Sequence, residues 1–123
     1  MPKILIAEDD ADVRLFLQEE LTDAGFTVTG VGDGADAVVV AVEESFDLYL
    51  LDMLMPGLDG IQTIRVLKRV TPDVPMIGHT GYVGLGYMAQ ASAYGVICLP
   101  KPVVMADLIK EINEAIQSAN PDP

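Results

Sequence analysis

The sequence is short of basic residues and contains a single cysteine and a single histidine. Seven Lys and Arg accompany 19 Asp and Glu, which leaves a formal net charge of −12. Such an acidic chain is not expected to bind nucleic acid or an anionic membrane directly, because both are bound through clustered cations. One cysteine cannot form an internal disulfide, which fits a reducing cytosol, so a cytoplasmic location is expected. No apolar run approaches membrane-spanning length.

The rest of the composition indicates one folded domain. Half of the 123 residues are apolar, which is enough to form a hydrophobic core in a chain of this length. Short apolar runs alternate five times with segments of helical periodicity. The strands are expected at residues 3–7, 27–30, 47–51, 75–79 and 96–99. The helices are expected between residues 10 and 25 and at 34–44, 61–70, 83–94 and 103–118.

This alternation predicts the fold class. The strand runs are almost wholly apolar, as in a parallel sheet that is covered on both faces. Right-handed crossovers then give an α/β fold with a doubly wound, five-stranded parallel sheet of the flavodoxin-like order 2-1-3-4-5. Residues 1–119 are expected to form the domain, and residues 120–123 a C-terminal tail.

Local signals set the expected limits of the first helix. Asp10 is suited to cap its N-terminus, and Gly25 is suited to end it in a left-handed turn. Its buried side is expected to carry Val13, Phe16, Leu17, Leu21 and Ala24. The isolated acids are expected only to be solvated; these are Asp12, Asp23, Asp33 and Asp59.

Polar residues follow the apolar part of four strands. Glu8 and Asp9 follow the first, Asp52 the third, Thr80 the fourth and Lys101 the fifth. Since the carboxyl ends of parallel strands meet at one edge of the sheet, these side chains should lie close together. Converging carboxylates repel one another and need a cation, and hard oxygen ligands suit Mg2+. A carboxylate nucleophile, a divalent ion, a hydroxyl and a lysine are the groups required for phosphoryl transfer to aspartate. Capping of the first helix is the alternative role for the two acids after the first strand.

Four segments of the sequence resemble the signatures of response-regulator receiver domains of two-component signalling. They are ILIAEDDADVR at 4–14, LLDMLMPGLDG at 50–60, HTG at 79–81 and KP at 101–102, and they occur in the family's order along the whole chain. The resemblance implies a phosphorylation-dependent signalling switch. A sensor histidine kinase or a histidine phosphotransfer protein would phosphorylate it. A downstream effector protein or domain would then bind the face formed by the fourth helix, fifth strand and fifth helix.

The resemblance also implies roles for individual residues. Asp52 is similar to the phosphoacceptor, Thr80 to the switch hydroxyl and Lys101 to the lysine that contacts the phosphoryl group. The Lys101–Pro102 peptide bond is expected to be cis. A bound Mg2+ or Mn2+ is expected to contact Glu8 (through water), Asp9, Asp52 and the backbone carbonyl of Leu54.

Three positions near the site need separate interpretations. Cys98 stands where receivers commonly carry a switch Tyr or Phe, which predicts an altered switch. Pro100 removes a backbone donor near the end of the fifth strand. His79 is expected to pack in the strand, not to carry a phosphoryl group or a metal ion.

Other functions share parts of this pattern. A haloacid-dehalogenase-like phosphatase needs a second carboxylate two residues after its nucleophile, where this chain has Leu54. A flavodoxin-type cofactor site needs a phosphate loop after the first strand, where the acids at 8–10 would repel a phosphate. A receiver fragment of a larger regulator, a docking module that works without phosphorylation, and a homodimer stay open. Beyond its own phosphorylation and dephosphorylation, the chain is not expected to be an enzyme.

Overall fold

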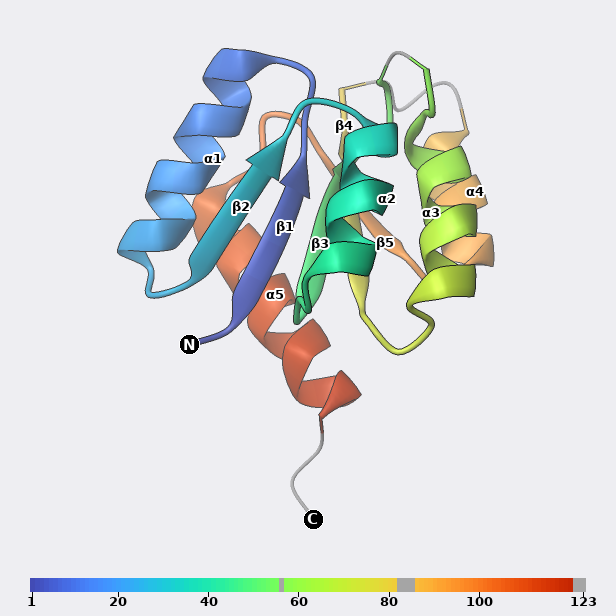
Figure 1. Ribbon diagram of the computed structural model, residues 1–123. Coiled ribbons are helices and arrows are strands. Elements are labelled where there is room, and N and C mark those ends of the chain that lie inside the picture. Colours follow the sequence, from blue (N-terminus) through green and yellow to red (C-terminus); the bar gives the residue numbers. More distant parts are fainter. Residues whose placement is uncertain (56, 82–85, 121–123) are drawn as a thin grey trace.

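Five short apolar strands form one parallel sheet in the computed structural model (Figure 1). The structure describes residues 1–55, 57–81 and 86–120. The strands are β1 (Lys3–Ala7), β2 (Thr27–Val31), β3 (Leu48–Asp52), β4 (Met76–Thr80) and β5 (Ile97–Pro100). They pair in the order β2-β1-β3-β4-β5, which confirms the predicted fold class and strand order.

Helices cover both faces of the sheet (Figure 1). The helices are α1 (Ala11–Asp23), α2 (Gly34–Glu43), α3 (Gly60–Val70), α4 (Tyr87–Ala93) and α5 (Met105–Ala119). Successive strand residues point to opposite faces, so each strand contributes to two cores. Ile4 and Ile6 pack with α1 and α5, whereas Leu5 and Ala7 pack with α2, α3 and α4. Burial of both faces explains why the central strands β1 and β3 are almost wholly apolar, whereas the edge strand β2 is only partly buried.

Four strands, β2 to β5, end one residue later than predicted, and in β3, β4 and β5 the added residue is polar or proline. Asp52 pairs with His79 across β3 and β4, and Thr80 pairs with Pro100 across β4 and β5. The residues expected just beyond the strands are therefore held within the hydrogen-bonded ladder. The fourth helix was predicted from residue 83, and residues 83–85 lie outside the described part of the chain. So do residues 121–123 of the predicted tail.

α1 begins and ends where the sequence signals predicted, but fewer of its side chains are buried than predicted. The Asp10 carboxylate accepts hydrogen bonds from the amides of Asp12 and Val13, and Gly25 adopts a left-handed φ of 102°. The predictions that Phe16 and Ala24 are buried were wrong: the Phe16 side chain is 51% exposed, and Ala24 is an exposed C-cap. The helix buries Leu17 and Leu21 against the sheet, whereas Phe16 lies outside that core cluster.

Two of the acids expected only to be solvated cap helices. Asp33 accepts a hydrogen bond from the Asp36 amide at the start of α2. Asp59 and Gln62 form a reciprocal capping box at the start of α3, with donor–acceptor distances of 2.9 and 3.0 Å. An acid followed three residues later by Gln is a sequence signature of a helix start, so this role was readable from the sequence.

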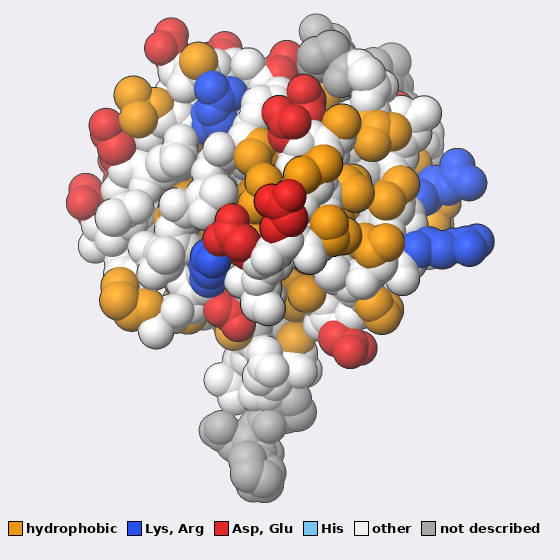
Figure 2. Space-filling model, in the orientation of Figure 1, with side chains coloured by type: hydrophobic (Ala, Val, Ile, Leu, Met, Phe, Trp, Pro, Cys, Tyr) orange, Lys and Arg blue, Asp and Glu red, His pale blue; other side chains and the backbone are white. Residues whose placement is uncertain are grey.

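The surface is mostly polar with local apolar areas. Figure 2 shows hydrophobic side chains gathered over α2, where Val39 and Val42 are more than half exposed. Within residues 1–55, 57–81 and 86–120, every helix is too short or too polar to cross a membrane.

Candidate functional site

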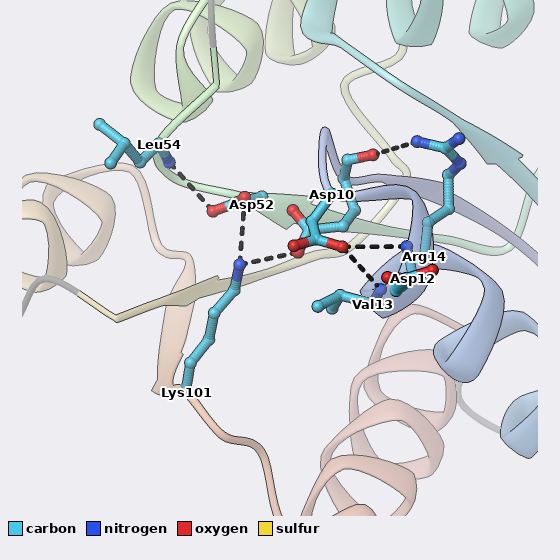
Figure 3. A network of polar contacts seen from close by, with 8 residues as sticks. Asp10, Asp12, Val13, Arg14, Asp52, Leu54 and Lys101 are labelled. Carbon is cyan, nitrogen blue, oxygen red and sulfur yellow. Dashed lines mark hydrogen bonds and ion pairs between the residues drawn. The ribbon is translucent and has the colours of Figure 1, made fainter.

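The polar residues at the strand ends meet at one edge of the sheet. Glu8 and Asp9 follow β1, Asp52 ends β3, Thr80 ends β4 and Lys101 follows β5. The Lys101 side chain extends toward Asp52 and the loop after β1 (Figure 3). Its Nζ lies 2.7 Å from Glu8 Oε1 and 3.2 Å from Asp52 Oδ2. One ammonium group therefore holds the two carboxylates together.

Asp52 is fixed at the end of a wholly buried strand. Its Oδ1 accepts a hydrogen bond from the Leu54 amide at 3.1 Å, and its Oδ2 contacts the Lys101 ammonium. Burial opposes ionisation of Asp52, but the neighbouring Glu8, the Leu54 amide and the Lys101 charge outweigh it and hold the pKa of Asp52 below its ordinary value. Asp52 is thus an ionised carboxylate in a largely desolvated place.

Glu8 is the most deeply buried acid of the group. Its side chain has no exposed surface, and burial together with the adjacent Asp52 raises its pKa to about 8. Burial alone would lower the pKa of Lys101, but its hydrogen bond to Glu8 and the Asp52 charge raise it. Glu8 therefore holds its proton to a higher pH than an ordinary carboxyl group, whereas Asp52 loses its proton at a lower pH.

The site has the composition of a divalent-metal centre. Ligand oxygens of Glu8, Asp9 and Asp52 lie within 4.8 Å of one another, and Asp9 is exposed to solvent. Glu8 Oε2 is buried without a hydrogen-bond partner among the described residues. A buried, unsatisfied carboxylate oxygen beside two other carboxylates is what a hard cation would satisfy. The donor set thus fits Mg2+ or Mn2+.

The remaining predicted residues lie around this centre. Thr80 is buried, and its carbonyl accepts the Lys101 amide at 2.8 Å. The Lys101–Pro102 bond is cis, as predicted. Cys98 is half-buried on β5, and burial together with the Asp52 charge raises the pKa of its thiol to about 11. That thiol stays protonated at neutral pH. The roles of the Thr80 hydroxyl and the Leu54 carbonyl stay predictions.

Some structural contacts of the site were not identified from the sequence. Arg14 Nη1 donates to the Glu8 carbonyl at 2.7 Å and so anchors the acidic loop to α1 (Figure 3). No sequence signal pointed to that contact. Gly60 approaches the chain just after Asp52 closely, because its amide donates to the Met53 carbonyl at 3.2 Å. A side chain at position 60 would collide with this backbone.

His79 is buried in β4 beside Asp52, consistent with its predicted packing role. Burial and the Lys101 charge lower the pKa of His79 to about 4, so its imidazole is neutral near pH 7. Its Nε2 has no hydrogen-bond partner among the residues that the structure describes.

Comparisons with known proteins agree with the family that the sequence signatures resemble. The family model of the response regulator receiver domain matches residues 4–113. The chain is 37% identical over 120 residues to the response regulator receiver protein CpdR of Brucella abortus, covering 97% of this chain and 100% of CpdR. It is 38% identical over 111 residues to the transcriptional activator protein PfeR of Pseudomonas aeruginosa, and the match covers 87% of this chain but 35% of PfeR.

Solved structures agree in fold. A response regulator receiver domain protein of Clostridium thermocellum matches with a TM-score of 0.91 and 30% identity over 96% of each chain. The receiver domain of Francisella response regulator 1452 matches with a TM-score of 0.90 and 25% identity, over 98% of this chain and 100% of that domain. With the strand order, the convergent carboxylates and the lysine already in place, these matches lead to one conclusion: the chain belongs to the response regulator receiver domain family.

Proposed function

We propose that this receiver is a phosphorylation-dependent signalling switch in which Asp52 accepts the phosphoryl group. The observation that carries the proposal is the convergence of Glu8, Asp9 and Lys101 on a buried, ionised Asp52. The donor would be a phosphohistidine of a sensor kinase or of a phosphotransfer protein. The chain would act on no substrate other than its own phosphoryl group.

The residues at this edge match the needs of that transfer. The bond from phosphorus to the donor imidazole nitrogen breaks as a bond from phosphorus to an Asp52 oxygen forms. The Leu54 amide orients the carboxylate, and the Lys101 ammonium lies where it can neutralise the arriving phosphoryl oxygens. Glu8, Asp9, Asp52 and the Leu54 carbonyl would hold Mg2+ or Mn2+, which supplies further charge neutralisation.

Magnesium should raise the melting temperature of the unmutated protein, because an ion that binds only the folded state stabilises it. At a Mg2+ concentration one hundredfold above the dissociation constant, the gain would be about 2.7 kcal/mol. Asp9→Asn keeps the size of an exposed side chain but removes one carboxylate. This variant should lose most of the magnesium-dependent rise, measured by circular dichroism at constant ionic strength.

Asp12→Asn is the matched control for that experiment. Asp12 is an exposed acid on the first turn of α1 and lies outside the group of converging carboxylates. Its replacement should leave the magnesium response unchanged. The metal site would be excluded if Mg2+ did not change the melting temperature of the unmutated protein. It would also be excluded if both variants lost the magnesium-dependent rise to the same extent.

The proposed output surface is formed by α4, β5 and the start of α5. Three large apolar side chains are exposed there: Tyr94 (39%), Ile97 (55%) and Val104 (61%). Exposed apolar area is one mark of a protein-binding surface. β5 also leads directly to Lys101, so a movement of the lysine toward a phosphoryl group would act on this surface.

Beryllofluoride, a mimic of a phosphoryl group on aspartate, should shift backbone amide signals in α4 and β5 as well as near Asp52. The expected cause is a rearrangement around Thr80 and Lys101 that extends along β4 and β5. Two-dimensional NMR with Mg2+ would measure it, and Asp52→Asn should show no shifts. Shifts restricted to the loops around Asp52 would exclude this surface as the output face.

A further inference from the structure

A concentration of positive charge lies on one helix of this acidic chain. Three of the seven Lys and Arg belong to α3, at positions 65, 68 and 69, so their side chains share one side of the helix. All three line a groove of about 930 Å3 between α3 and the end of α4. Figure 2 shows Lys and Arg side chains projecting at that margin of the molecule. These α3 cations are Arg65, Lys68 and Arg69.

The α3 cations differ in their partners from basic residues elsewhere in the chain. The ammonium groups of Lys3 and Lys101 form ion pairs, and the Arg14 guanidinium donates to a backbone carbonyl. No ion pair or side-chain hydrogen bond joins an α3 cation to another residue in the part of the chain that the structure describes. Their charges are therefore available to the carboxylates of another molecule.

Stabilisation of the helix end accounts for only part of this pattern. Lys68 and Arg69 lie in the last turn of α3, where positive charge interacts favourably with the helix dipole. Arg65 is exposed and lies a full turn earlier, where that effect has faded. The backbones of Arg65 and Arg69 are about 6 Å apart along the helix axis. Two carboxylates one turn apart on an opposing helix have the same separation, so they could pair with both.

Apolar side chains complete the lining of the groove. Leu58 and Val66 are half-buried, and Tyr94 at the C-cap of α4 is 39% exposed. Tyr and Arg are both enriched at protein interfaces, because each combines a flat apolar surface with hydrogen-bonding groups. Apolar side chains with cations beside them match an amphipathic helix that carries acids next to its apolar stripe.

The net charge favours a short acidic segment over an extended polyanion. Nucleic acid carries a charge at every phosphate, and the phosphates beyond the groove would be repelled by a chain with a net charge of −12. A short protein segment needs only the carboxylates that the α3 cations can match. The expected occupant is therefore a segment of another protein.

We propose that this groove binds an acidic amphipathic helix of a partner protein. The apolar side chains of the helix lie over Val66 and Tyr94, and its carboxylates pair with the α3 cations. The proposal does not depend on phosphorylation, because it uses none of the residues that contact Asp52. Tyr94 also belongs to the proposed output surface, whereas α3 lies outside it. The groove thus extends the binding surface of the domain beyond α4 and β5.

The test uses synthetic peptides of about 16 residues, a length at which helices begin to be stable in water. All carry the same helical stripe of Leu, and the positions beside the stripe are Glu, Gln or Lys. The Glu peptide should shift the backbone amides of Gln62, Val66 and Tyr94 in a saturable manner. The Gln peptide should bind about tenfold more weakly, because each exposed ion pair contributes a factor of about two to three. The Lys peptide should leave these amides unshifted, and sodium chloride should weaken binding of the Glu peptide alone.

Arg69→Gln and Lys110→Gln are matched variants, since each removes one charge from an exposed residue. Arg69 lines the groove, whereas Lys110 lies on α5 and outside the groove lining. Arg69→Gln should weaken binding of the Glu peptide about two- to threefold and leave the Gln peptide unaffected. Lys110→Gln should change neither affinity. Dispersed amide spectra check that both variants are folded.

Equal affinities for the Glu and Gln peptides in the unmutated protein, or equal effects of the two substitutions, would overturn the proposal. An oligothymidylate that shifted the same amides at a lower concentration than the Glu peptide would also overturn it, because the groove would then be a nucleic-acid site. If Asp52 failed to accept a phosphoryl group, these titrations would not change, so the two proposals are tested separately.

Discussion

Asp52→Asn should abolish phosphorylation completely while leaving the protein folded. Incubated with Mg2+ and acetyl phosphate, the unmutated protein should gain the mass of one phosphoryl group, and the variant should gain none. Asparagine keeps the shape of the side chain but offers no carboxylate nucleophile. Intact-protein mass spectrometry measures the gain, and its loss on treatment with hydroxylamine identifies an acyl phosphate.

The fold should tolerate this change because Lys101 keeps a closer partner. Its Nζ is 2.7 Å from Glu8 and 3.2 Å from Asp52, so the shorter contact remains. Removing the Asp52 charge also removes one of the influences that raise the pKa of Glu8, which favours an ion pair between Glu8 and the ammonium. Asp59→Asn is the control, since Asn caps helices about as well as Asp. A phosphoryl group still found on a carboxylate of the Asp52→Asn variant would show that the acceptor is another residue.

Gly60→Ala should lower the free energy of unfolding by about 2–3 kcal/mol. A Cβ at position 60 would overlap Met53 Cα and lie 2.9 Å from the Asp52 carbonyl oxygen. Neither atom can move easily, because both belong to the backbone at the end of a buried strand. Alanine is favoured over glycine in helices by up to about 1 kcal/mol, so the steric cost has to exceed that gain. Urea denaturation followed by circular dichroism measures the difference.

Gly32→Ala is the matched control for the steric argument. A Cβ there would come no closer than 3.4 Å to its neighbour, which is a side-chain nitrogen of Arg14 and not backbone. The expected change is below about 0.5 kcal/mol. If both variants unfolded at the same urea concentration, the close approach of α3 to Asp52 would not be a steric requirement.

Much of the fold and the location of the site followed from simple rules. Strands buried on both faces have apolar runs that are easily found, and the topology of a doubly wound sheet brings their carboxyl ends together. Glu8, Asp9, Asp52 and Lys101 were therefore predicted as neighbours from the sequence alone. The capping roles of Asp33 and Asp59 were missed because both acids were treated as isolated surface charges, although helices were predicted to begin at residues 34 and 61.

Other features depend on side-chain packing that a linear sequence does not record. The pairing of Lys101 with Glu8 depends on which rotamer spans the gap between β5 and β1. The exposure of Phe16 depends on how α1 is rotated about its own axis, because Leu17 and Leu21 occupy the buried side. The lack of a hydrogen-bond partner for His79 Nε2 among the described residues depends on how the side chains around β4 pack.

Pro100 has a consequence for self-association. β5 is an edge strand, and such edges can template the addition of strands from other molecules. The Lys101 amide donates to Thr80 of β4, and because amides alternate in direction along a strand, position 100 faces the open side. Proline has no backbone N–H at this position. The backbone amide of Cys98 is therefore the one donor of this four-residue strand that faces the open side. The edge that carries the exposed Ile97 is thereby protected against edge-to-edge aggregation.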